Sequence, residues 1–289
     1  MITPGDEAVR PAEGKGFAEA VTISFADGER VWCGMARLGL APDAGSALAV
    51  LFRDREPVGA FATGGLEVPE GADWAALDLG PLRTTVEEPL ERWTVAWDGQ
   101  DSGFDLAVEA VSAPAEREAG LAGYEQLVRV RGTVRVGEET FEVEGLGQRG
   151  HTWGFADWSS LELVRTGSAW LGEERGGIVL ESLRSQKAAG HGDEQIWAAV
   201  VEHGEPVTVA DPRLSTTYDA EGHQLRAGLE LWLGSEEVYP VRAAGEIICG
   251  SSLDLGTLRL DLAFFRWHAD GSVGVGRYDV LRRAAPAAP

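Results

Sequence analysis

Short runs in which apolar and polar residues alternate, separated by turns that contain glycine, extend along almost the whole sequence. Residues 20–26 form one such run, followed by Asp27-Gly28, and residues 91–97 form another, closed by Asp98-Gly99. Alternation with a period of two is typical of a strand with one buried face, and Asp-Gly between two strands is typical of a β-hairpin. Helical runs do not alternate with the strands, which disfavours a doubly wound nucleotide-binding fold. The pattern therefore predicts an all-β protein built from antiparallel hairpins, with very little helix.

The predicted strands are too many for one barrel of ordinary size, so two barrel-like domains in tandem are the simplest arrangement. We expect a flexible N-terminal arm over residues 1–16, because this segment is polar and rich in proline and glycine. We expect the first domain over residues 17–150, the second over residues 151–283, and a disordered tail over residues 284–289.

The composition excludes several classes of partner and cofactor. With 47 acidic and 25 basic residues, the net charge of −22 disfavours nucleic acid and anionic membrane surfaces. Cys33 and Cys249 have no metal-ligand or disulfide spacing, which fits a reducing compartment. The N-terminus lacks the basic and apolar segments of a signal peptide, and no apolar run is long enough to cross a membrane. We expect a cytoplasmic protein with no metal or nucleotide cofactor and no stable membrane insertion, and the sequence assigns no oligomeric state.

Residues 145–158 bring a histidine, an arginine, a carboxylate and two tryptophans together among four glycines. Glycine is favoured where a backbone bends or is approached closely. His151 and Trp153 are two residues apart, so their side chains share one face if the backbone is extended. This spacing places the best proton-transfer candidate of the chain beside an aromatic ring. The residues alone equally allow a packing histidine and a core tryptophan.

This stretch resembles the central signature of the hydroxyneurosporene synthase (carotenoid hydratase) superfamily, which is lipocalin-related and includes AttH-like proteins and natural-product cyclases. The positions that carry the resemblance are Gly145, Gly147, Arg149, His151, Trp153, Gly154, Asp157 and Trp158. Similar segments lie upstream, at Tyr124-Glu125-Gln126, at Val130-Arg131-Gly132, and at Trp32, Gly34, Arg37, Gly39 and Pro42. The resemblance covers most of residues 20–282. It implies two tandem, antiparallel, lipocalin-like (calycin-type) β-barrel or half-barrel domains and a cofactor-free lyase, either a hydratase or a cyclase.

The chain departs from this superfamily at positions that bear on the reaction. Many relatives carry aspartate where Gly150 stands, and the carotenoid hydratases carry Tyr-x-Asp in the window that here spans residues 174–182. Glu181 is the nearest strand carboxylate in that window. We expect His151 to pair with Asp157 or Glu181, in which case a buried carboxyl of raised pKa delivers the proton. A turn aspartate bonded to backbone amides and an outward-facing glutamate are the alternatives.

Further side chains are candidates for binding the substrate. Arg149 has the geometry to clamp a carboxylate, although an arginine at this position also suits a structural ion pair. The run that contains Tyr124 and Glu125 is similar to the superfamily, and Glu125 is a second candidate acid. The chain has ten tryptophans, a number that suits either aromatic lining of a cavity or core packing. Trp153, Trp158 and Trp170 are nearest to the signature, and predicted strands contain Trp197, Trp232 and Trp267. Of these, the candidates for binding the substrate are Trp158, Trp170 and Trp197.

The predicted activity is proton-initiated hydration or cyclisation of an apolar substrate inside a barrel cavity. Isoprenoids, polyenes and polyketide-like metabolites are the substrate classes that the resemblance implies. The alternative is a lipocalin-like protein that binds a hydrophobic metabolite without chemistry, which the missing Tyr-x-Asp supports. Formation of a product, detected as an added water or as an isomer, distinguishes the two.

Overall fold

The computed structural model describes residues 1–10, 14, 16–29, 31–118, 120–155, 158–234 and 239–284. Strands account for 70% of the described residues and helix for 2%, which confirms the predicted all-β class. The two helices are short 3₁₀ turns, Pro4–Glu7 and His191–Asp193. None of the described helices has the length and apolar character needed to traverse a membrane.

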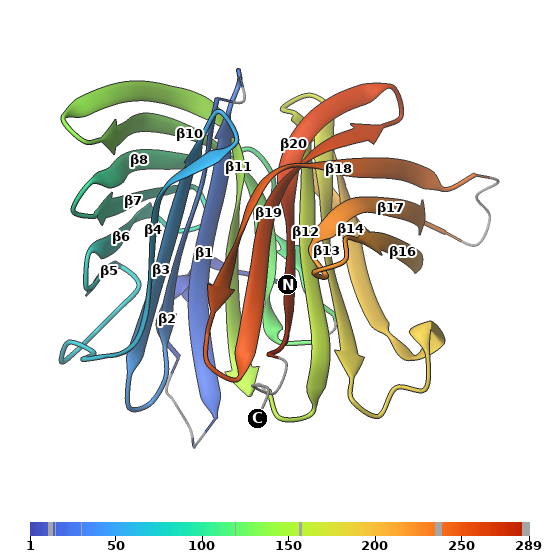
Figure 1. The fold of residues 1–289 in the computed structure, drawn as a ribbon, viewed down its shortest axis with the longest axis horizontal. Coiled ribbons are helices and arrows are strands. Elements are labelled where there is room, and N and C mark those ends of the chain that lie inside the picture. Colours follow the sequence, from blue (N-terminus) through green and yellow to red (C-terminus); the bar gives the residue numbers. More distant parts are fainter. Residues whose placement is uncertain are drawn as a thin grey trace. The chain divides into compact units, whose positions relative to one another are not determined.

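The described chain divides into two compact units, each built on its own antiparallel sheet (Figure 1). The first unit contains Met1–Arg117, Leu121–Ala156 and His203–Pro206, and the second contains Glu118–Gly120, Asp157–Glu202 and Val207–Pro289. The two sheets form a nearly closed barrel and a half-barrel, which confirms two tandem lipocalin-like domains. His151, which the sequence places at the start of the second domain, belongs to the first unit because its strand pairs on both sides there.

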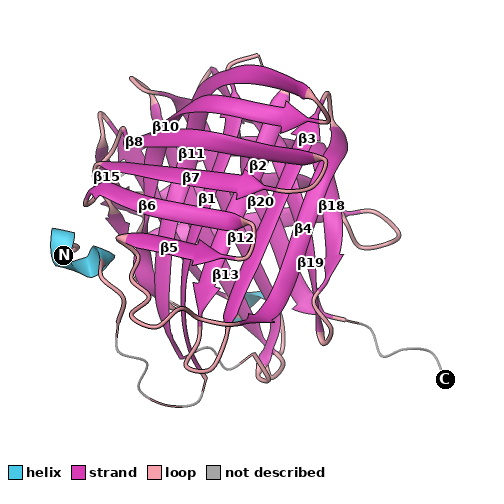
Figure 2. Ribbon diagram, turned by 90° about the vertical axis from the view of Figure 1, so that its left-hand side faces the viewer, coloured by secondary structure: helices cyan, strands magenta, loops and turns pink. Residues whose placement is uncertain are grey.

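The first unit has an eleven-stranded sheet in the order β4-β3-β2-β1-β11-β10-β8-β7-β6-β5, with β9 paired to β10. Its strands are β1 (Phe17–Asp27), β2 (Trp32–Leu40), β3 (Gly45–Arg53), β4 (Glu56–Leu66), β5 (Ala76–Leu79), β6 (Leu82–Glu88), β7 (Arg92–Asp98), β8 (Ser102–Ala110), β9 (Ala115–Glu116), β10 (Ala122–Val136) and β11 (Glu139–Phe155). The sheet folds over so that β5 to β8 cross β1 to β4 (Figure 2).

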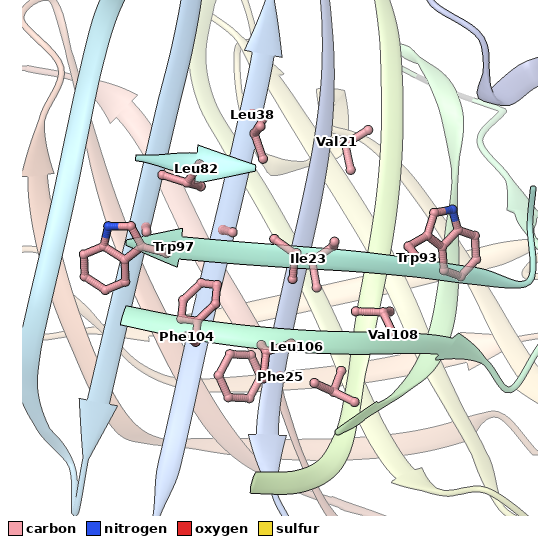
Figure 3. Close-up of a cluster of buried hydrophobic side chains, with 14 of the residues drawn as sticks. Val21, Ile23, Phe25, Leu38, Leu82, Trp93, Trp97, Phe104, Leu106 and Val108 are labelled. Carbon is pink, nitrogen blue, oxygen red and sulfur yellow. The ribbon is translucent and has the colours of Figure 1, made fainter. Parts of the chain in front are cut away.

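The interior of the first unit is filled by apolar side chains from both sets of strands. Val21, Ile23 and Phe25 alternate along β1 on the inner face, as the sequence pattern predicts, and all are buried. They face side chains of β7 and β8, among them Trp93 and Leu106 (Figure 3). We call the side of the sheet that carries Val21 and Ile23 the inner face.

The second unit has a nine-stranded sheet in the order β15-β14-β13-β12-β20-β19-β18-β17-β16. Its strands are β12 (Leu161–Gly172), β13 (Gly176–Ser185), β14 (Gln195–Glu202), β15 (Glu205–Thr208), β16 (Asp211–Tyr218), β17 (Gln224–Trp232), β18 (Val241–Asp254), β19 (Leu258–Ala269) and β20 (Ser272–Arg283). Residues 209–210 connect the two edge strands, β15 and β16. The backbone amide of Val209 donates to the carbonyl oxygen of Ala198 on β14, and that of Ala210 donates to the carbonyl oxygen of Trp232 on β17, each at 2.9 Å. Phe265, Trp267 and Tyr278 are at the centre of its core.

The glycines of the signature let β11 lie close to its neighbour. A Cβ atom on Gly147 would stand 2.1 Å from the carbonyl oxygen of Ser24 on β1, and one on Gly145 would stand 1.8 Å from that of Ala26. No side chain fits at either position without separating the two strands. These glycines therefore serve the β1–β11 pairing, which in turn positions His151.

We expect Gly147→Ala to lower the free energy of unfolding by about 1–3 kcal/mol, because overpacking forces the β1 backbone away. Gly64→Ala on β4 is the matched control, since nothing lies within 4 Å of the place that its Cβ would occupy. The control should leave the free energy unchanged or raise it by about 0.4–1 kcal/mol. Urea denaturation of both variants measures the effect, and equal midpoints would show that close strand approach does not explain Gly147.

Candidate functional site

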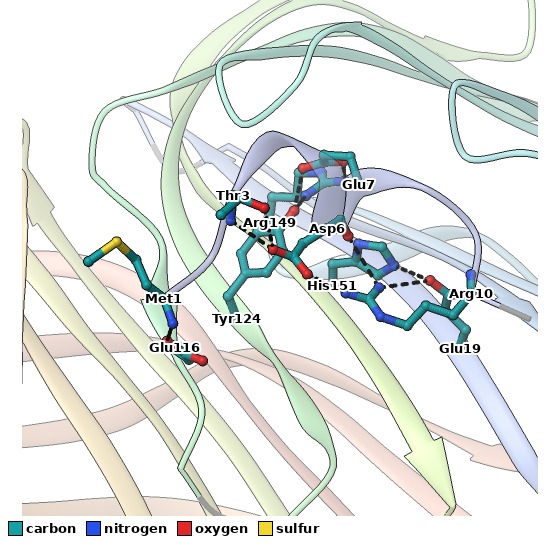
Figure 4. Close-up of polar contacts among 10 residues, drawn as sticks. All are labelled: Met1, Thr3, Asp6, Glu7, Arg10, Glu19, Glu116, Tyr124, Arg149 and His151. Atoms are coloured by element: carbon teal, nitrogen blue, oxygen red, sulfur yellow. Dashed lines mark hydrogen bonds and ion pairs between the residues drawn. The ribbon is translucent and has the colours of Figure 1, made fainter.

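Five polar side chains gather on the inner face of the first unit, where β1, β10 and β11 run side by side (Figure 4). His151 on β11 lies opposite Val21 of β1 and opposite Tyr124 of β10. The members of this inner cluster are Glu7, Glu19, Tyr124, Arg149 and His151, and none is more than 4% exposed. Buried charges are stable only when they are paired or hydrogen-bonded, so the partners of each group define what the cluster can do.

Glu19 on β1 is the carboxylate that pairs with His151. The distance from its Oε1 to the imidazole Nε2 is 2.8 Å. An ionised carboxylate only accepts hydrogen bonds, so in the neutral imidazole the proton resides on Nε2 and donates to Glu19. Nδ1 is then an acceptor, and it has no hydrogen-bond partner among the described residues. The pair therefore presents a proton-accepting nitrogen in an orientation that Glu19 fixes.

The surroundings of the pair set its charge state. Burial lowers the pKa of His151 from its ordinary value, although the hydrogen bond to Glu19 opposes this effect. Burial alone would raise the pKa of Glu19. Hydrogen bonds from His151 and from the backbone amide of Arg10, the latter at 3.0 Å, outweigh burial, and the pKa is lowered. The site therefore holds an ionised carboxylate beside a neutral imidazole near neutral pH.

Arg149 lies on the same face, two residues before His151, and has two oxygen partners. Its Nη1 donates to the hydroxyl of Tyr124 and its Nη2 to Oε2 of Glu7, each at 2.6 Å. The Tyr124 hydroxyl itself donates to Glu7. Burial raises the pKa of Tyr124, so the phenol stays protonated. The guanidinium also stacks 4.4 Å from the ring centroid of Trp93.

The N-terminal segment covers the inner cluster. Glu7 ends the first 3₁₀ turn and is buried against Arg149, while Arg10 stacks 3.2 Å from the ring centroid of Trp153. Arg10 also bonds Asp6 at 2.9 Å. The sequence predicts a flexible arm here, but residues 3–10 are held by these buried contacts. Composition does not reveal this, because the contacts of two individual residues, Glu7 and Arg10, hold the segment. Residues 11–13 and 15 lie outside the described residues.

Trp153 lies beside His151, as its spacing predicts. Their ring centroids are 5.2 Å apart and edge to face, and Trp74 approaches the same imidazole at 5.5 Å. Asp157 lies outside the described residues. Trp158 is 36% exposed. The remaining candidates belong to the second unit and are buried there: Trp170 on β12, Glu181 on β13 and Trp197 on β14.

Glu125 lies on the opposite face of β10 from Tyr124, because neighbouring strand residues alternate. It bonds Gln148 and lies 3.8 Å from Arg117, so the structure keeps it out of the inner cluster. Its Oε2 is 2.3 Å from where a Cβ on Gly150 would stand. An aspartate at position 150 would thus clash with a like charge, which accounts for the glycine.

Sequence reasoning overlooked Glu19, although the sequence contains a signal for it. Glu19 occupies an inward position in the alternating series formed by Phe17, Glu19, Val21, Ile23 and Phe25. A carboxylate within an apolar inward-facing series requires a buried partner. The local pattern does not identify that partner, His151, because it is 132 residues away along the chain.

One turn of the second unit groups possible metal ligands. Ligand atoms of Asp219, Glu221 and His223 lie within 4.8 Å of one another. Both ring nitrogens of His223 already have neighbours, since Nδ1 is 3.0 Å from Asp219 Oδ2 and Nε2 is 2.5 Å from Arg259 Nη2. These contacts describe a surface ion-pair network and assign no metal.

The pH dependence of stability tests the charge states of Glu19 and His151. Both groups have a lower pKa in the folded chain, so the stability that they contribute is present above their unfolded values and lost as the pH falls. We expect the free energy of unfolding to decrease from about pH 7 to about pH 4. The double variant Glu19→Gln, His151→Gln should lose less over this range.

Urea denaturation at a series of pH values measures this dependence. Glu116→Gln changes a carboxylate whose side chain is 50% exposed, and it should follow the wild-type slope. A double variant as pH-dependent as the wild type would refute the assigned charge states.

Known proteins were compared with this chain by sequence and by structure, and the similar solved structures share its fold. No curated protein sequence matches the chain. An AttH-like protein from Nitrosomonas europaea is similar in structure, with 13% identity, coverage of 91% of each chain and a TM-score of 0.66. Kievitone hydratase from Nectria haematococca is 10% identical over 93% of this chain and 90% of its own, with a TM-score of 0.68. CghA with Sch210972 is 12% identical over 93% of this chain and 89% of its own, with a TM-score of 0.69.

At these identities the likeness establishes a shared fold, which agrees with the fold that the sequence resemblance implies. A more specific match comes from a family model, described as a domain of unknown function (DUF7064), which covers residues 3–284. The chain belongs to this family.

Proposed function

We propose that this protein is a cofactor-free enzyme of the hydratase or cyclase type that acts on an apolar small molecule. The observation that carries the proposal is the buried His151–Glu19 pair, whose Nδ1 is available to accept a proton. Support comes from the shared fold with kievitone hydratase. Isoprenoid, polyene and polyketide-like compounds are the substrate classes that we consider.

The lowered pKa of His151 determines the order of proton transfers in this proposal. A neutral imidazole is a base, so it does not begin the reaction by protonating an alkene. Nδ1 instead takes a proton from water or from a substrate hydroxyl as that oxygen bonds to one carbon of a polarised double bond. The other carbon then takes the proton back from Nδ1. Glu19 stabilises the imidazolium between these steps, and the atoms balance as addition of water or as isomerisation to a ring.

The neighbouring aromatic rings suit an apolar substrate. Trp74, Tyr124 and Trp153 surround the imidazole with ring centroids 5.2–5.9 Å from its own. Flat apolar groups bind to such rings, and exclusion of bulk water strengthens the electrostatic effect of the pair. In the proposed enzyme these rings orient the double bond toward Nδ1.

Access to the pair requires residues 3–10 to move, because Glu7 and Arg10 cover it. When Glu7 leaves, Arg149 and Tyr124 lose an acceptor and become donors for the substrate. Such donors would stabilise the negative charge that develops on an enolate oxygen during addition to a conjugated carbonyl compound. We therefore propose that the N-terminal segment opens for the substrate and closes over it.

Replacement of His151 and Glu19 tests the proposed activity. Kievitone and a panel of conjugated polyenes are supplied to the full chain, and mass spectrometry detects an added water or an isomer. We expect His151→Gln to lower kcat/KM by about 10²–10⁴-fold, as is typical when general acid–base catalysis is lost. Activity of the unaltered chain should decline as the pH falls through the lowered pKa of His151, because protonation of Nδ1 removes the base.

Two further variants separate the site from general effects. His268→Gln changes an exposed histidine and should leave kcat/KM unchanged. Glu7→Gln removes the charge of the ion pair that joins residues 3–10 to Arg149, and it should maintain or raise kcat/KM. Full turnover by His151→Gln would overturn the assignment of the base.

Binding without chemistry is the competing function. The specific observation in its favour is that the chain's own segment, through Glu7 and Arg10, covers the inner cluster. A binding protein would show saturable uptake of the same compounds and no product. The mass measurement that tests the enzyme therefore decides between the two functions.

A further inference from the structure

The second unit contains a cavity that the proposed reaction does not use. Its volume is about 310 Å³, at the lower end of the range typical of small-molecule sites. Arg165, Arg184 and Arg282 line it, together with Leu163, Leu214 and Tyr218. Every lining residue belongs to the second unit, whereas the inner cluster lies wholly within the first.

Three guanidinium groups at one cavity are unusual in a chain of net charge −22. Among the described lining residues Glu194 is the one carboxylate; it contacts Arg165 and lies 3.7 Å from Arg184. Two carboxylates outside the lining form ion pairs with Arg282 and Arg184. Asp261 lies 3.0 Å from Arg282, and Glu162 lies 3.0 Å from Arg184. The charge that faces the cavity is therefore positive, although the surroundings balance much of it.

Arg165 is held in place at the wall of the cavity. It is 3% exposed, its Nη1 donates to Thr216 Oγ1 at 3.0 Å, and its Nη2 donates to Ser182 Oγ at 3.1 Å. Thr216 is in turn 2.6 Å from the hydroxyl of Tyr278. These bonds fix the plane of the guanidinium, and a fixed fork of N–H donors matches the two oxygens of a carboxylate.

Several donors in this lining lack an acceptor. The Nε atoms of Arg165, Arg184 and Arg282 and the hydroxyl of Tyr218 are buried, and none has a hydrogen-bond partner among the described residues. Buried polar groups are nearly always paired, so four unpaired groups at one cavity need an explanation. A ligand that brings acceptor oxygens would supply partners to those within its reach.

The rest of the wall is apolar. Leu163, Leu214 and Tyr218 all pack against the hydrophobic core of the second unit. A ligand that fits therefore combines an anionic end with an apolar body. We propose that the second unit binds an amphipathic carboxylate in this cavity, with the carboxylate at the arginines and the apolar body against Leu163 and Leu214. This site is separate from the proposed reaction and does not depend on it.

Titration calorimetry with two acids and their neutral esters tests the site. Decanoate and 2-naphthoate are compared with methyl decanoate and methyl 2-naphthoate on the full chain. A charge-assisted hydrogen bond contributes about 1.5–3 kcal/mol, so the acids should bind about 10- to 150-fold more tightly than the esters. Tyr218→Phe keeps the ring and removes one donor, and it should weaken binding of the acids about twofold to tenfold while sparing the esters.

A pair of tryptophan variants on β16 locates the ligand. Leu214→Trp fills the cavity and should abolish binding of the acids. Thr217→Trp is the matched control, because Thr217 is exposed on the same strand and outside the lining, and it should leave binding intact. Circular dichroism verifies that both variants are folded. Equal affinity for acids and esters, or unchanged binding by folded Leu214→Trp, would overturn the proposal.

Discussion

The hydrogen bond between Glu19 and His151 is the interaction on which the interior of the first unit depends. Both groups are almost fully excluded from water, so neither would be stable there alone. Glu19 accepts bonds from the imidazole and from the backbone amide of Arg10, and it attracts the Arg10 guanidinium at 3.4 Å. One carboxylate thus fixes the imidazole proton on Nε2 and holds the N-terminal segment in place.

The position of that bond follows from strand pairing. The register that sets Glu19 opposite Trp153 and Val21 opposite His151 brings the two side chains together on one face. Gly145 and Gly147 permit this register, since a side chain at either would collide with the β1 backbone. The glycines of the signature therefore allow β11 to pair closely with β1, and this pairing positions His151 beside Glu19.

Local patterns predicted the class of fold and the shared face of His151 and Trp153, because alternation with a period of two is a property of adjacent residues. They did not predict the partners. Glu19 is 132 residues from His151, and Glu7 is 142 residues from Arg149. Such contacts depend on which strands pair and in which register, and short-range periodicity does not encode either. The same limit explains why Glu181, chosen by its window in the sequence, is found in the other unit.

Glu19 holds His151 as a neutral base whose Nδ1 has no hydrogen-bond partner in the part of the chain that the structure describes. Nitrogen-15 NMR of the labelled chain near neutral pH measures this directly, with the His151 signals assigned by their loss in His151→Gln. The predicted result is a neutral ring with its proton on Nε2, which changes in Glu19→Gln. A doubly protonated ring, or a proton on Nδ1, would contradict the account.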